Sequence, residues 1–132
     1  MDRVDEAREW IVYADNDMDA AHQLATFMQP KMEIICYHCQ QSAEKMLKAF
    51  LVYSNITPPR THELGELVSM CEGVDSTFSE LAGECIRLND YASQPRYPFG
   101  MEITDYDMRT ALIDCKRIGE FIRAKIIMDK QE

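Results

Sequence analysis

The chain has 132 residues, 46% hydrophobic and 28% charged, which is typical of a single globular domain with a real hydrophobic core. Its formal charge of −9 argues against a general nucleic-acid binder, because phosphate neutralisation needs clustered Lys and Arg, although a local basic site stays open. No run approaches the roughly 20 apolar residues of a membrane span. The charged N-terminus lacks the apolar core of a secretory signal, so we expect a cytoplasmic protein with no membrane partner.

The first two predicted helices span residues 4–27 and 32–53, with Pro30 breaking the pattern between them. In the second, apolar residues recur every three or four positions and form one broad face. A face this broad predicts a central helix with neighbours on more than one side. Its apolar positions are Cys36, Cys39, Ala43, Met46 and Phe50, widened by Ile35, Leu47 and Leu51.

Residues 55–62 contain two prolines and predict a turn-rich connection. Thr61 is the expected N-cap of a short third helix, and Gly73 is expected to end it. Thr77 with Glu80 predicts a capping box for a fourth helix.

Residues 93–100 hold two prolines and a glycine, so they cannot be helical. Thr104 with Asp107 predicts a capping box that opens the last helix. No segment shows sustained period-two alternation, so no strands are expected. We predict one all-α domain over residues 1–132, an antiparallel up-and-down four-helix bundle with one additional short helix. Its expected core includes Trp10, Cys39, Met46, Phe50, Leu67, Leu81, Cys85, Leu88, Leu112 and Ile122.

Five cysteines is an odd number, and all five lie in predicted helices, so a disulfide scaffold is not expected. Cys36 and Cys39 have the spacing of half a zinc site, but no second Cys or His pair follows at finger-like spacing. Both also lie on the apolar face of the central helix. We therefore predict buried cysteines, with no metal and no cofactor.

Three groups of polar residues could bind a ligand, and each has a purely structural interpretation. His38, Gln41, Lys45 and Lys48 form a polar stripe on the central helix, which faces a groove, a partner or solvent. In the solvated interpretation, Glu44 and Lys48 form an i,i+4 ion pair. Arg60 and His62 precede a helix, where backbone N–H groups could help hold an anion, or His62 could simply close the turn.

The third group combines arginine with tyrosine around the proline-rich segment: Arg87, Tyr91, Arg96 and Tyr97. Arginine suits bidentate phosphate binding and tyrosine can stack on a base, whereas the structural interpretation is that the segment caps the bundle. Basic residues also recur every seven positions in the last helix, at Arg109, Lys116, Arg123 and Lys130. Such a line could meet RNA or an acidic partner, or pair with neighbouring acids.

Four motifs resemble the HEPN domain family and span nearly the whole chain in the expected order. They are Trp10, the run Cys-Tyr-His-Cys-Gln-Gln-Ser-Ala-Glu-Lys-Met-Leu-Lys-Ala over residues 36–49, Pro-Arg-Thr-His-Glu-Leu over 59–64, and Arg-Tyr-Pro over 96–98. The resemblance implies a helical bundle that commonly forms a homodimer and is often encoded beside a minimal nucleotidyltransferase, in pairs that resemble toxin–antitoxin modules.

Many members of that family are metal-independent ribonucleases with an Arg, four to six intervening residues and a His, which act on the phosphate and the ribose 2′-hydroxyl. Counting back from His22, His38 and His62, no qualifying position holds an arginine. Counting forward from Arg87, no qualifying position holds a histidine.

We therefore expect a non-catalytic binding domain that recognises a nucleotide, a nucleic acid or a minimal nucleotidyltransferase partner. Its expected ligand-binding residues are Arg60, His62, Arg96 and Tyr97, with Lys45 as an addition. The alternatives are a ribonuclease with a non-standard site, such as His62 meeting Arg96, and a structural oligomerisation module.

Overall fold

The computed structural model describes residues 2–92 and 102–131, with side chains as far as Ile126. In these residues the chain forms five α-helices, two short 3₁₀ segments and no strand, which confirms the all-α prediction. The predicted loop at 93–100 lies outside the described residues. The elements are α1 (Arg3–Ala25), α2 (Met32–Tyr53), α3 (Leu64–Val74), η1 (Ser76–Leu81), α4 (Ala82–Asn89), η2 (Asp90–Ala92) and α5 (Asp105–Gln131).

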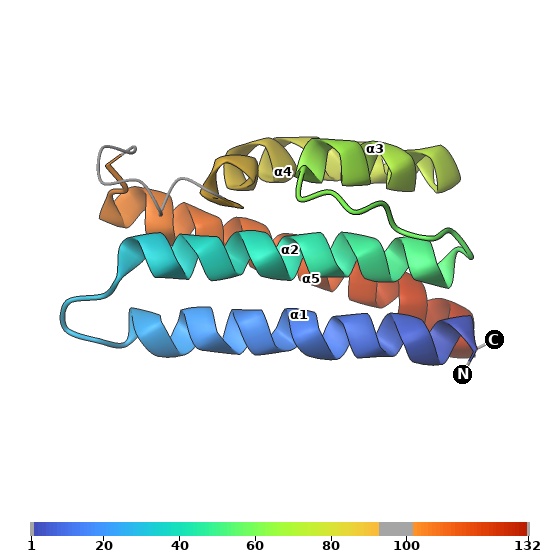
Figure 1. The fold of residues 1–132 in the computed structure, drawn as a ribbon, viewed down its shortest axis with the longest axis horizontal. Helices are drawn as coiled ribbons and strands as arrows, with labels where there is room; N and C mark the ends of the chain where they lie inside the picture. The colour runs from blue at the N-terminus through green and yellow to red at the C-terminus, as the bar shows by residue number, and fades with distance from the viewer. Residues whose placement is uncertain (1, 93–101, 132) are drawn as a thin grey trace.

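The centre of the bundle is α2, as its broad apolar face predicts. Helices α1 and α2 form an antiparallel hairpin, α3 and α4 lie along the other side of α2, and α5 runs behind (Figure 1). Helix α2 contacts all four of the other α-helices. Of its 22 residues 14 are buried, so a helix with one apolar face and one polar stripe is enclosed on nearly all sides.

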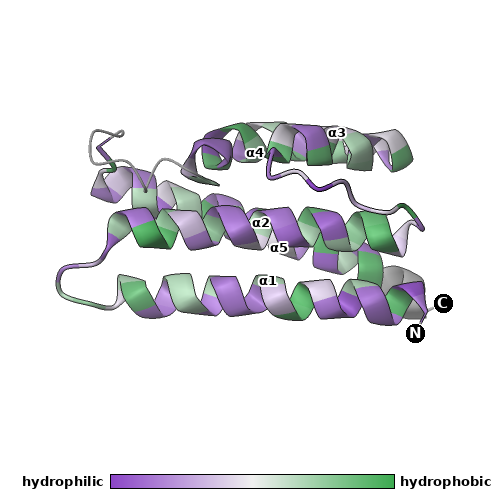
Figure 2. Ribbon diagram, in the orientation of Figure 1, coloured by the Kyte–Doolittle hydropathy of each residue, from purple (hydrophilic) through white to green (hydrophobic). Residues whose placement is uncertain are grey.

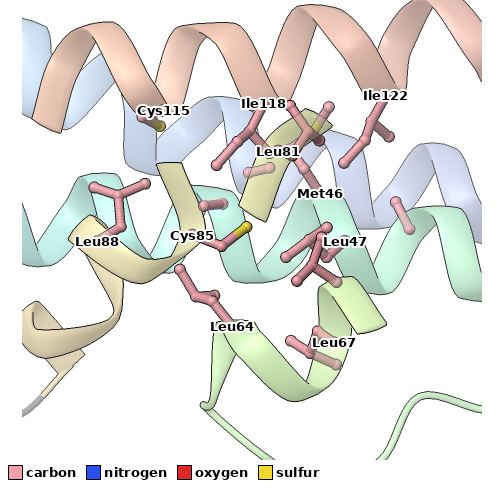
Figure 3. Packing of buried hydrophobic residues seen from close by; sticks show 14 of the residues in the cluster. Met46, Leu47, Leu64, Leu67, Leu81, Cys85, Leu88, Cys115, Ile118 and Ile122 are labelled. Atoms are coloured by element: carbon pink, nitrogen blue, oxygen red, sulfur yellow. The ribbon is translucent and has the colours of Figure 1, made fainter. Parts of the chain in front are cut away.

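The core lies where α2 meets α3, α4 and α5 (Figure 3). Phe78 is fully buried between Phe50 of α2 and Phe121 of α5, at ring-centroid distances of 4.4 and 5.1 Å. Two members of the predicted core are wrong, because Trp10 and Leu112 are only partly buried at its edge. The other eight are buried.

The helix ends follow the predicted capping chemistry in one case and depart from it in others. The Thr104–Asp107 box is confirmed, since each side chain accepts the other's backbone N–H at 3.1 and 3.0 Å. The Thr77–Glu80 box is wrong: Asp75 caps this segment by accepting from Thr77 N, and the chain begins as 3₁₀ helix.

The ends of α3 also differ from the predicted ones. Glu63, not Thr61, is the N-cap residue, and it makes no capping bond with its side chain. Instead Asn89, at the end of α4, accepts from Leu64 N at 2.8 Å and donates to Glu63 at 2.7 Å. At the other end the predicted stop at Gly73 is wrong, since the helix continues to Val74. Gly73 does not have the positive φ that a glycine adopts when it terminates a helix.

A tight stop at the end of α2 turns the chain back along that helix. Asn55 has a φ of 64°, and the N–H groups of Asn55 and Ile56 donate to Val52 O and Leu51 O, which is a Schellman motif. Residues 57–63 then run back beside α2 to the start of α3 (Figure 1). This return brings His62 beside the middle of α2.

Candidate functional site

A polar network joins α1, α2 and the returning loop, and it includes the hydrophilic middle of α2 (Figure 2). Its first unit is centred on Asp17 of α1. One carboxylate oxygen of Asp17 lies 2.9 Å from His38 Nδ1, and the other lies 2.5 Å from Lys45 Nζ. Both partners come from α2, so Asp17 fastens the hairpin through two bonds.

The second unit repeats this arrangement around Glu44 of α2. One Glu44 oxygen lies 2.9 Å from His62 Nδ1, and the other lies 3.1 Å from Lys48 Nζ. Gln40 adds a bond from its side chain to the carbonyl oxygen of His62 at 3.0 Å. The returning loop is therefore held against α2 by both the ring and the backbone of His62.

Each of the two carboxylates thus holds one histidine and one lysine. A carboxylate only accepts hydrogen bonds, so Nδ1 of each imidazole carries the hydrogen and Nε2 is left available. The side chain of His62 is 73% exposed, whereas the Glu44 carboxylate that orients it is only 5% exposed. The His62 ring is therefore exposed to solvent while the buried Glu44 carboxylate fixes its orientation.

The polar stripe of α2 is not the solvated face of the structural interpretation. The Glu44–Lys48 pair forms as predicted, but both side chains are buried, and Lys48 Nζ lies 5.8 Å from the centre of the Trp10 ring. Two buried ionised groups are tolerated because each compensates the other. Asp17 and Glu44 also cancel the charges of Lys45 and Lys48.

The predicted ligand-binding residues are only partly brought together. Arg60 is exposed in the returning loop, two residues before His62, and forms no ion pair within the described part of the chain. Lys45 bonds to Asp17, not to the carboxylate that holds His62. Arg96 and Tyr97 lie outside the described residues.

Asp17 and Glu44, which organise this network, are not among the ligand-binding residues predicted from the sequence. Glu44 was visible as the i,i+4 partner of Lys48. Nothing in the sequence distinguishes Asp17 from the other acidic residues of α1. Its role becomes clear only when α1 packs on α2 and Asp17 meets His38 and Lys45.

Arg87 and Tyr91 form structural contacts and do not join the His62 network. Arg87 Nε and Nη2 bind the buried Asp114 carboxylate of α5 at 2.8 and 2.9 Å, a bidentate pair. Arg117 of α5 reaches back to Glu84 of α4, so two reciprocal ion pairs join these helices. Tyr91 is buried, and burial raises its pKa to about 12.

A groove of about 580 Å³ opens between α4 and α5 beside these ion pairs. Ile86 and Tyr106 line it, and Ile113 lies two turns along α5 from Tyr106; all three are exposed. We call the groove, with these three exposed apolar side chains, the α4–α5 surface.

The basic line of α5 pairs with acids. Arg109 bonds to Asp105 at 2.7 Å, Lys116 lies 3.8 Å from Glu120, and Arg123 bonds to Asp15 of α1 at 2.5 Å. The side chain of Lys130 lies outside the described residues. Three of the four cations are therefore neutralised locally, as in the structural interpretation.

Two kinds of feature are absent from the described residues. Across residues 2–92 and 102–131, no helix has the length and apolar character needed to cross a membrane. Nor do three or more His, Cys, Asp or Glu side chains in this part of the chain come together in a way that could hold a metal ion.

Comparison with known proteins identifies the class of fold. The HEPN domain model matches residues 7–125. The solved structure of TT1696 from Thermus thermophilus is similar with a TM-score of 0.78 and 24% identity, over 95% of this chain and 99% of that one. ST0689, an archaeal HEPN homologue, is similar with a TM-score of 0.71 and 20% identity, over 91% and 97% of the two chains. Comparison with curated proteins finds no match.

Because the domain model covers most of its length, the chain belongs to the HEPN domain family.

Proposed function

We propose that this HEPN domain is a non-catalytic binding domain that recognises a phosphate-bearing ligand, a nucleotide or single-stranded RNA, through Arg60 and His62. The observation that carries the proposal is the exposed His62 ring, held in one orientation by a buried carboxylate. When both ring nitrogens carry hydrogen, such a ring can donate from Nε2 to a phosphate oxygen without losing much conformational freedom on binding.

Arg60 supplies the permanent positive charge of this proposed site. It is exposed two residues from His62, and a guanidinium can bind two phosphate oxygens at once. Lys45 and Lys48 are paired with carboxylates and so act as anchors of the network rather than as additional phosphate ligands. With so few free cations, we expect modest affinity that weakens as salt rises.

The absence of the Arg-x4-6-His pattern supports binding rather than cleavage. The unorthodox ribonuclease remains the alternative, because both imidazoles bonded to carboxylates resemble the oriented bases of hydrolytic enzymes.

The test is fluorescence anisotropy with labelled ATP and labelled single-stranded RNA, followed by analysis of RNA length. His62→Ala and Arg60→Ala should each weaken binding by about tenfold, the loss expected for one charge-assisted contact. Arg8→Ala removes an exposed arginine from α1 and serves as the matched control. Cleavage that disappears in His62→Ala would support the ribonuclease instead.

A protein partner is the second candidate, and the α4–α5 surface favours it. Exposed apolar side chains gathered at a groove are typical of interaction sites. The partner would be a second copy of this chain or a minimal nucleotidyltransferase, as in modules of the toxin–antitoxin type. Tyr106→Glu should shift a homodimer to monomer in light scattering after size exclusion, whereas Tyr13→Glu, at an exposed tyrosine of α1, should not.

A further inference from the structure

A cavity of about 290 Å³ lies between α1 and α5, and residues of α2 complete its lining. Helices α1 and α5 pack only lightly on each other, whereas α1 packs closely on α2. Ser42, Met46 and Cys115 line the inner part of the cavity and are buried. Cys115 points from α5 into the bundle (Figure 3), and its Sγ lies 3.3 Å from Met18 Sδ. None of the residues that line the cavity belongs to the His62 network.

Gly119 of α5 keeps this cavity open. It lies in the middle of α5, whereas the other glycines of the described residues lie within one turn of a helix end. Gly119 has no positive φ, and an added Cβ would meet only Met46 Cε at 3.9 Å, so neither the backbone nor close packing requires glycine. Glycine inside a helix is less stable than alanine, but its missing side chain leaves space beside Met46. This choice of residue favours an open cavity over a stable helix.

Charged side chains of both signs surround the mouth of the cavity: Asp15, Asp19, Lys116, Glu120 and Arg123. Arg123 is bonded to Asp15 at 2.5 Å. Lys116 Nζ lies 3.8 Å from Glu120, which is beyond hydrogen-bond distance. Asp19 is exposed and forms no ion pair within the described part of the chain. One carboxylate, on α1, and one ammonium, on α5, are therefore available to a ligand.

The size, lining and charge of the cavity together define a class of ligand. Ligand pockets usually measure roughly 300–1,000 Å³, so this cavity, at their lower limit, suits a small molecule rather than a nucleotide or a peptide. Methionine side chains are flexible and polarisable, and they adapt to unbranched apolar groups. A free carboxylate and a free ammonium at one opening complement a head group that carries both charges.

We propose that this cavity binds a free α-amino acid with an unbranched apolar side chain, for which L-methionine and L-norleucine are the probes. The ligand side chain lies in the space beside Gly119 and contacts Met18 and Met46. The ligand ammonium donates to Asp19, and the ligand carboxylate accepts from Lys116. Since Asp19 belongs to α1 and Lys116 to α5, the bound head group joins two helices that otherwise pack lightly.

The test is isothermal titration calorimetry of the protein with L-methionine, with thermal unfolding at increasing ligand concentration as a second readout. Wild type should bind one molecule per chain, and its Tm should rise with ligand concentration. L-Norleucine should bind about equally well. N-Acetyl-L-methionine lacks the ammonium and L-methioninamide lacks the carboxylate, so each should bind about tenfold or more weakly.

Three variants locate the ligand. Gly119→Leu should remove binding, because the leucine side chain fills the space beside Met46. Asp19→Asn should weaken L-methionine binding by about tenfold but should not change the binding of N-acetyl-L-methionine, which has no ammonium. Asp5→Asn removes an exposed carboxylate at the other end of α1 and is the matched control, with unchanged binding. Circular dichroism checks that each variant is folded, and if Gly119→Leu does not fold, Asp19→Asn decides.

Equal binding of L-methionine and N-acetyl-L-methionine by wild type would overturn the proposal, because the charged head group would then not be recognised. Unchanged binding in a folded Gly119→Leu variant would also overturn it, since the ligand would then lie elsewhere. The absence of both heat and a thermal shift at millimolar L-methionine would do the same. Binding of ATP and RNA should be unchanged in Asp19→Asn, so this proposal and the proposed function can fail separately.

Discussion

Glu44 and His62 are 18 residues apart in the chain and meet at 2.9 Å between Oε1 and Nδ1. The carboxylate is buried and the imidazole is exposed. Glu44 therefore holds the ring in place, and His62 exposes that ring to solvent. The same carboxylate compensates the buried charge of Lys48, which makes Glu44 the residue on which the whole unit depends.

Glu44→Gln should therefore destabilise the protein by about 3 kcal/mol, because it leaves the buried Lys48 ammonium without its counter-charge. The double variant Glu44→Gln with Lys48→Met should recover most of this loss, since it removes the uncompensated charge. His62→Ala should cost less than about 1 kcal/mol, as its ring is exposed. Urea unfolding measures all three. A double variant no more stable than Glu44→Gln would contradict the explanation.

The bidentate pair between Arg87 and Asp114 should distinguish arginine from lysine. Arg87→Lys keeps the charge but cannot form two parallel bonds to the carboxylate, so we expect a loss of about 1 kcal/mol. Asp114→Asn should cost about 2 kcal/mol, because it removes a buried charge partner. Thermal unfolding by circular dichroism checks both. Wild-type stability in Arg87→Lys would show that the second bond contributes nothing.

Asp75 should make stability fall in acid. Hydrogen bonds from Lys125 and Thr77 lower its pKa to about 2 from an ordinary value of 3.8. A lowered pKa in the folded state stabilises the protein above the unfolded value, and this contribution disappears as the pH falls from about 4 to about 2. Its size is of the order of 1 kcal/mol, since solvent screens this partly exposed pair.

Urea unfolding at several pH values between neutrality and pH 2 should show a shallower acid decline in Asp75→Asn than in wild type. Lys125→Met should show part of the same effect, because Lys125 Nζ lies 2.7 Å from the carboxylate. An unchanged acid decline in both variants would exclude Asp75 as its source.

Gly119→Ala should stabilise α5. Gly119 lies inside the helix, and an added Cβ would meet only Met46 Cε at 3.9 Å, an ordinary contact. We expect a gain of about 0.5–1 kcal/mol from the reduced freedom of the unfolded chain. Gly83→Ala is the matched comparison and should gain less, because its Cβ would lie 3.5 Å from the Arg87 guanidinium. Chemical denaturation of both variants makes the comparison.

The parts of the fold that depend on nearby residues could be predicted from the sequence. The apolar face of α2 follows from side chains three and four positions apart, and the Thr104–Asp107 box from four consecutive residues. Asp75 is equally local, but Asp75 and Thr77 both offer a capping pattern, and the sequence contains nothing that chooses between them.

The network around His62 could not be predicted in this way, because its bonds join segments far apart in the chain. The Asp17–His38 and Asp17–Lys45 bonds depend on the register of the α1–α2 hairpin. The Glu44–His62 bond depends on the return of the loop after Asn55. Helical periodicity identifies a polar stripe on α2 but not the carboxylates that bind it.

The order of the helices has a consequence for the kinetics of folding. Helix α1 packs mainly on α2, its neighbour in the chain, so this hairpin closes only a short loop and should form early. Helix α5 comes last and covers the side of α2 that carries Met46, so that side stays open to aggregation until α5 docks. Ala14→Gly should therefore mainly slow folding, whereas Ile122→Val should mainly speed unfolding, as stopped-flow measurements would show.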